Sequence, residues 1–89
     1  MSCRIDRVLT ADGVVLRMSG RIAAHDLDML RDLLAQETGI VAVDLTHLLL
    51  VDRDAVKLLA AAEANGVALT NCPAYLREWV ARERAQTNE

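Results

Sequence analysis

A run of six residues, IVAVDL from Ile40 to Leu45, limits the choice of fold more than any other feature of the chain. Its side chains are apolar on both faces of an extended strand until Asp44. Such runs are typical of interior strands in a parallel sheet, with helices packed against them. Helix-type patterns stand on both sides of the run, and this alternation implies parallel pairing with right-handed crossovers. The sequence therefore predicts an α/β fold.

The remaining elements can be placed around this strand. Two strand-type runs, 4–10 and 14–19, flank Ala11-Asp12-Gly13, and Asp-Gly between such runs predicts a β-hairpin. Leucines at helical spacing predict a first helix within 23–39 that stops at Gly39. Further patterns predict a second helix over 52–65, a short strand over 67–70 and a last helix opening at Pro73.

The predicted order is β-β-α-β-α-β-α, a four-stranded mixed sheet with three helices. The chain of 89 residues fits one small domain, 1–89, with a frayed end from about residue 85. In the last helix an apolar group is expected to be buried, and an alternating set of charges is expected to be solvated. The apolar group is Tyr75, Leu76, Trp79 and Val80, and the charged set is Arg77, Glu78, Arg82, Glu83 and Arg84.

Composition and charge exclude several classes of function. The net charge is −3, with no cationic stripe or row of aromatic side chains, so nucleic-acid binding is not expected. No apolar run approaches the roughly 20 residues that cross a bilayer, so direct membrane insertion is not expected. Arg4, Asp6 and Arg7 interrupt any signal-peptide pattern, and Cys3 and Cys72 lack metal-site spacing. A cytoplasmic location is the expectation.

Catalytic and metal-binding chemistry is also not expected. Asp44, Asp52 and Asp54 could hold Mg²⁺ only if carboxylates met at the ends of two or more strands, and the first strand offers no acid there. His25 and His47 are far apart in the sequence, and neither lies near a nucleophile with an orienting acid. We expect no enzyme activity, no metal and no cofactor.

One cysteine invites a redox interpretation. Cys72 precedes Pro73 at the start of a helix, where the pKa of a thiol can be depressed. The preferred interpretation is a small, half-buried residue without a redox role.

The segment DLTHLLLVDRDAV, from Asp44 to Val56, is the most informative about function. Its first residues end the strand near Leu45, and 46–51 are expected to form a loop over the end of the sheet. Asp52 is a suitable N-cap, and Asp54 falls in the first turn, near the positive end of the helix dipole. Arg53 has no expected structural role and should project into solvent, beside the apolar residues that precede the cap.

This arrangement resembles the STAS domain, the fold of bacterial anti-sigma factor antagonists. In that family a glycine follows the second strand, a "hDLs…h.hhD" strand and loop follows the first helix, and Asp-Ser-Ser-Gly opens the second helix. The matching features here are Gly20, VAVDLTHLLLVD from Val41 to Asp52, and the later strand GVAL from Gly66. The resemblance covers nearly the whole chain and implies a regulatory protein-binding module.

The departures from the family concern its phosphorylation switch. In the family, a partner kinase phosphorylates the second hydroxyl residue after the Asp. Here Asp52 is retained, Arg53 replaces the first hydroxyl residue, Asp54 occupies the phosphoacceptor position and Ala55 replaces the glycine. The resemblance therefore implies a module without that switch. Asp54 is interpreted either as a permanent mimic of the phosphorylated form or, preferably, as a helix-opening acid.

Two hypotheses of function follow from the resemblance. The first is a non-enzymatic module that binds an anti-sigma factor of the kinase type. The alternative is a small accessory subunit that binds the ATPase of a bacterial ABC system for lipid transport. Self-association as a homodimer is left open. In both hypotheses the contact surface is predicted to comprise Leu49, Leu50, Asp52, Arg53, Asp54 and Lys57.

Overall fold

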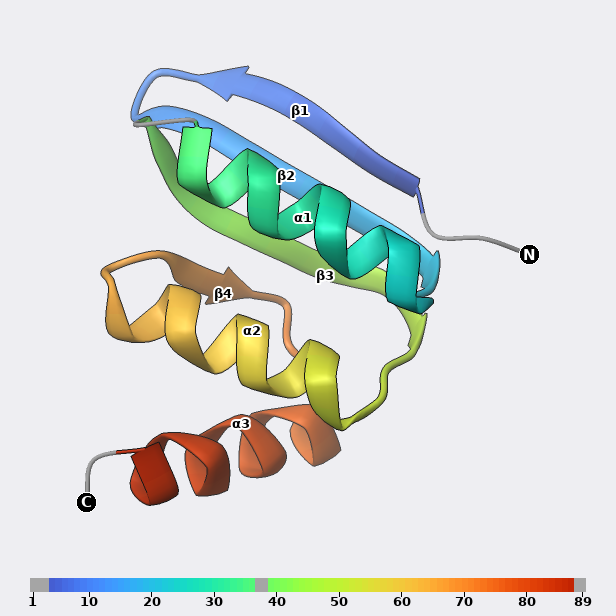
Figure 1. Ribbon diagram of the computed structural model, residues 1–89. Helices are drawn as coiled ribbons and strands as arrows, with labels where there is room; N and C mark the ends of the chain where they lie inside the picture. The colour runs from blue at the N-terminus through green and yellow to red at the C-terminus, as the bar shows by residue number, and fades with distance from the viewer. Residues whose placement is uncertain (1–3, 37–38, 88–89) are drawn as a thin grey trace.

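The computed structural model describes residues 4–36 and 39–87. Its strands and helices follow the predicted order (Figure 1). The strands are β1 (Arg4–Thr10), β2 (Gly13–Arg21), β3 (Ile40–Leu50) and β4 (Ala68–Thr70), and the helices are α1 (Ala24–Gln36), α2 (Arg53–Ala64) and α3 (Ala74–Thr87).

The four strands form one mixed sheet in the order β1-β2-β3-β4. β1 pairs with β2 antiparallel, whereas β2–β3 and β3–β4 are parallel pairs. The predicted fold class is confirmed, and β3 is an interior strand as its apolar run indicated. Of the segment expected to fray, residues 85–87 belong to α3, and 88–89 lie outside the described residues. Cys3 also lies outside them.

The predicted hairpin joins β1 to β2 through Ala11 and Asp12, with Thr10 opposite Gly13. Gly13 has a φ of +140°, and a Cβ atom there would lie 2.6 Å from the carbonyl oxygen of Gly39. The neighbouring Val14 amide donates to that same oxygen, at 2.8 Å. A side chain at this position would therefore push apart the turn and the start of β3.

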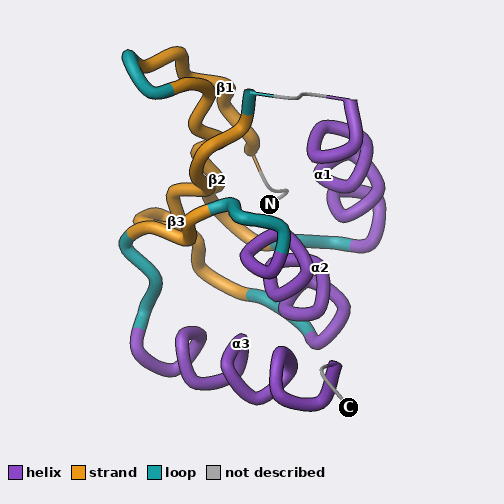
Figure 2. The backbone as a smooth tube through the Cα atoms, turned by 90° about the vertical axis from the view of Figure 1, so that its left-hand side faces the viewer, coloured by secondary structure: helices purple, strands orange, loops and turns teal. Residues whose placement is uncertain are grey.

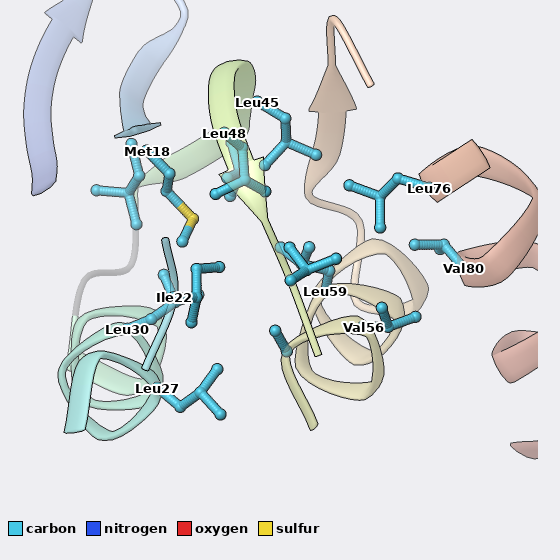
Figure 3. Close-up of a cluster of buried hydrophobic side chains, with 14 of the residues drawn as sticks. Met18, Ile22, Leu27, Leu30, Leu45, Leu48, Val56, Leu59, Leu76 and Val80 are labelled. Carbon is cyan, nitrogen blue, oxygen red and sulfur yellow. The ribbon is translucent and has the colours of Figure 1, made fainter. Parts of the chain in front are cut away.

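The helices α1 and α2 lie side by side on one face of the sheet, and α3 lies against α2 beyond the short β4 (Figures 1 and 2). Side chains from the sheet and all three helices meet in one core, part of which is drawn in Figure 3. Among the fully buried members are Leu16, Met18, Leu30, Leu45, Leu59, Leu76 and Val80. No described element covers the opposite face of the sheet (Figure 2).

The expected loop over 46–51 is wrong for most of its length, because β3 continues to Leu50. Its pairing with β2 shifts register between Arg17 and Ser19 and again after Gly20, as in a β-bulge. These irregularities let Leu45 and Leu48 both point into the core, although two residues separate them. Strict alternation along the strand would have placed them on opposite faces.

Two expectations for α3 are also wrong. Tyr75 was expected to be buried, but 52% of its surface is exposed, whereas Leu76 and Val80 are fully buried as predicted. Glu83 was expected on a solvated face, but only 6% of it is exposed. Because α3 packs against α2 rather than lying on the sheet, its buried side includes a charged residue that can meet an arginine of α2.

Candidate partner-binding surface at the start of α2

Asp52 caps α2, as the sequence predicted. Its backbone is extended (φ −109°, ψ −178°), and its Oδ1 accepts a hydrogen bond from the Ala55 amide at 3.0 Å. Its carbonyl oxygen accepts the first helical bond, from the Val56 amide at 3.1 Å. Ala55 and Val56 are fully buried, so the cap also fixes the residues that anchor the helix in the core. The Asp52 carboxylate therefore has a structural task.

Arg53 does have a structural contact, contrary to the sequence-based expectation. Its Nε lies 3.5 Å from Oε2 of the buried Glu83, on α3. The Arg53 side chain is still 64% exposed, so it spans from the α2–α3 contact to the solvent. A buried carboxylate requires a partner to offset its loss of hydration. The Arg53 guanidinium is one such partner for Glu83.

Asp54 and Lys57 lie on the other flank of α2, facing α1. Both are exposed, and both line a shallow depression whose opposite wall holds Asp28 and Arg31 of α1. Neither Asp54 nor Lys57 takes part in any ion pair of the described residues, whereas Arg31 Nη1 lies 3.0 Å from Asp28 Oδ1. The consecutive residues Arg53 and Asp54 thus turn toward different neighbouring helices.

The three leucines before the cap differ in their placement. Leu48 is buried, whereas 71% of Leu49 is exposed near the end of β3. The side chain of Leu50 lies outside the described part of the structure, although its backbone ends β3. An exposed leucine at the end of a strand can contribute apolar area to a protein contact surface.

Asp44 contacts polar groups of the sheet and of the residue that follows β4. Asp44 Oδ1 accepts hydrogen bonds from the Thr46 amide at 3.0 Å and from Asn71 Nδ2 at 3.2 Å, and its Oδ2 lies 3.8 Å from Arg17 Nε. The hydrogen bonds from Thr46 lower the pKa of the Asp44 carboxyl, with smaller contributions from Asn71 and Arg17. Asp44 therefore connects β2, β3 and the residue after β4.

No group of three or more His, Cys, Asp or Glu side chains within the described ranges is arranged to hold a metal ion. His25 Nε2 lies 3.4 Å from Asp26 Oδ1 at the start of α1, and His47 is exposed on β3. Asp26 is buried there and accepts a hydrogen bond from the Ala23 amide at 2.9 Å. The carboxylate of Asp26 thus caps α1.

The thiol of Cys72 is half-buried, and burial raises its pKa. Arg77 opposes this shift and Glu63 adds to it, but both act less strongly than burial. A thiol with a raised pKa is a poorer nucleophile near neutral pH, in keeping with the preferred interpretation of Cys72.

No protein-family model matches the chain, and no curated protein matches it either. Across the described residues, none of the helices has both the length and the apolar character needed to cross a bilayer.

Sequence reasoning missed three residues that complete this surface. Asp28 and Arg31 of α1 face Asp54 and Lys57 across the depression, and Glu83 of α3 holds Arg53. A signal was available for the first two, because DMLR on α1 and DAVK on α2 share one spacing of acid and base. The sequence carries no comparable signal for the burial of Glu83.

Proposed function

We propose that this chain is a non-enzymatic, cytoplasmic regulatory module of the STAS type that binds a partner protein through the start of α2. The observation that carries the proposal is the pair Asp54 and Lys57, exposed and unpaired among the described residues, with the exposed Leu49 shortly before the helix. Two charges without internal partners contribute little to folding, which leaves them available to a second protein.

The STAS resemblance is supported by the order of the elements and by local geometry. Gly20 lies at the end of β2 with a φ of +86°, a conformation in which glycine is favoured, where the family has its glycine. Asp52 caps α2 where the family has its Asp. Because Asp54 occupies the phosphoacceptor position, the proposed module binds without a phosphorylation switch.

The test is affinity capture from the native cell extract with quantitative mass spectrometry. The bait proteins are the wild type, Lys57→Glu and Leu49→Ser, with Arg82→Glu as the matched control, since Arg82 is exposed on α3 and its change alters the charge equally. We expect one partner to be enriched by the wild type and the control, and to be reduced at least about fivefold by the other two. Equal capture of that partner by all four proteins would show that the surface is wrongly assigned.

The identity of the captured partner separates the two hypotheses. An anti-sigma factor of the kinase type supports the regulatory proposal, and Asp54→Ser then becomes the variant with which to ask whether the kinase can phosphorylate this position. The ATPase of an ABC transport system supports the accessory-subunit hypothesis instead. Neither outcome requires the chain to have catalytic residues.

Arg53 is a poor choice for this test, although the sequence singles it out. Because Arg53 also pairs with the buried Glu83, reversing its charge would disturb the α2–α3 contact as well as any bound partner. Lys57 and Leu49 are free of that complication.

A further inference from the structure

A shallow groove runs between α1 and α2 on the outer surface of the helix layer. Its first part, about 470 Å³, has Leu27, Leu58 and Ala61 as its apolar lining. Its second part, about 260 Å³, shares Leu58 and Ala61 and continues along Leu34 to Asn65 and Val67. From Asp54 to Asn65 the α2 wall spans about 17 Å at 1.5 Å per residue. The groove is thus as long as three turns of helix.

The two walls of the groove carry matching charges. Both helices follow parallel strands and return against them, so α1 and α2 point in the same direction (Figure 1). On α1 Asp28 precedes Arg31, and on α2 Asp54 precedes Lys57, each pair three residues apart. All four line the same depression. Two acids therefore flank the groove near the helix N-termini, and two bases flank it one turn further on.

These charges can be engaged from outside. Asp54 and Lys57 have no ion pair among the described residues. Asp28 and Arg31 pair with one another, but their side chains are 77% and 59% exposed, and such exposed pairs exchange readily for other partners. The half-buried Leu58 leaves apolar surface uncovered between them. An apolar floor with charged rims is the form in which amphipathic helices are recognised.

We propose that the groove receives an amphipathic helix of the partner protein, lying antiparallel to α1 and α2. This orientation places the C-terminal end of the incoming helix, which favours basic residues, beside Asp28 and Asp54. An acid one turn earlier then lies beside Arg31 and Lys57. The partner helix accordingly carries an apolar stripe and a Glu-x-x-x-Lys spacing in its last turns, a spacing that also stabilises the isolated helix. The inference rests on the proposed function and specifies the chemistry of its partner.

The experiment uses two synthetic helical peptides of about 15 residues that share one composition and one leucine stripe. One carries Glu-x-x-x-Lys near its C-terminus, and the other carries Lys-x-x-x-Glu at the same positions. Isothermal titration calorimetry on the full chain should show that the first peptide binds about fivefold more tightly than the second. The doubly substituted chain Asp54→Lys with Lys57→Asp should lose or invert that preference, and Arg82→Glu should keep it.

Three outcomes overturn the inference: no binding of either peptide, equal binding of both, or an unchanged preference in the doubly substituted chain. Circular dichroism on each variant verifies that it is folded, as expected for exposed positions. The peptide titration does not use the natural partner. A negative result there can therefore be told apart from a negative result in the partner capture that tests the proposed function. If the peptides fail while partner capture still depends on Lys57, the surface is correct and the helix is not its occupant.

Discussion

The two flanks of α2 use their charges in opposite ways. Toward α3, Arg53 pairs with the buried Glu83, and Glu63 Oε1 accepts from Arg77 Nη2 at 2.7 Å and from Arg84 Nη1 at 3.0 Å. Toward α1, the groove is open, and its charges Asp54 and Lys57 are unpaired within the described residues. Charges on the α3 flank should therefore influence stability, whereas those on the α1 flank should influence binding.

The largest effect is expected at Leu59, a fully buried residue of α2. Leu59→Ala should reduce the free energy of unfolding by about 2–5 kcal/mol, because it removes buried methyl groups and leaves a cavity. Leu58→Ala, next to it on the open groove, should cost only about 1 kcal/mol because Leu58 is half-buried. Urea titration measures both. Equal losses would mean that the α1 flank is as tightly packed as the core.

The next largest effect is expected from charge reversal, which should reduce stability on the α3 flank of α2 but not on the α1 flank. Arg53→Glu places a second carboxylate beside the buried Glu83 and should destabilise the fold by about 1–2 kcal/mol. Lys57→Glu makes the same change of charge on the open flank and should stay within about 0.5 kcal/mol of the wild type. Thermal unfolding of the two variants, followed by circular dichroism, provides the comparison. If Lys57→Glu lost as much stability as Arg53→Glu, the proposed difference between the two flanks would be wrong.

The two acids that open α2 should also differ. Asp52→Ala removes the hydrogen bond to the Ala55 amide and should cost about 1 kcal/mol. Asp54→Ala removes only an exposed charge near the helix dipole, with an expected loss of about 0.3–0.5 kcal/mol. Urea denaturation measures the two losses from the shift of the midpoint, provided that the slope of the unfolding free energy against urea concentration is the same in each variant. If Asp54→Ala proved the costlier change, Asp54 would be a structural residue and its role in binding would need revision.

The α3 flank should also show a dependence of stability on pH in the acid range. Hydrogen bonding from Arg77 lowers the pKa of the Glu63 carboxyl below its ordinary 4.5, although burial opposes the shift. Because its pKa is lower in the folded state than in the unfolded chain, Glu63 stabilises the fold fully above about pH 4.5, and this contribution is lost as the pH falls through the folded-state pKa.

Glu63→Gln should therefore lower the free energy of unfolding at neutral pH by at most about 1 kcal/mol, because Arg77 and Arg84 are both partly exposed. The difference in stability between this variant and the wild type should shrink below about pH 4. Glu78→Gln is the control, because Glu78 is an exposed glutamate of the same helix as the two arginines. Unfolding curves from about pH 3 to 7 test the difference. If the loss of stability in Glu63→Gln did not change with pH, it would arise from packing rather than from the charge of Glu63.

Local signals predicted the elements well. Asp-Gly between strand-type runs indicated the hairpin, and Asp52 before the apolar spacing of α2 indicated its start, because turns and caps depend on neighbouring residues alone. The extension of β3 to Leu50 was not predictable in this way. It depends on register shifts against β2, which bring Leu45 and Leu48 to the same side.

The candidate site was only half predictable for a related reason. Asp52 and Asp54 were identified from their places at the start of the helix and Lys57 from the contact region that the family resemblance implied, and the structure keeps Asp54 and Lys57 exposed. The contact of Arg53 with Glu83 depends on how α3 packs against α2, and the two residues are 30 positions apart in the sequence. The opposing pair Asp28 and Arg31 likewise depends on the parallel placement of α1 and α2.

The most direct measurement exploits the fact that Lys57 is the only lysine in the sequence. An amine-acylating reagent, followed by mass spectrometry, reports the accessibility of its side chain in the free protein and in the complex with the captured partner. If the partner docks on the α1 flank at the start of α2, acylation of Lys57 should be slowed at least about fivefold in the complex. Acylation at the same rate in the free and bound states would contradict the proposal and place the partner elsewhere.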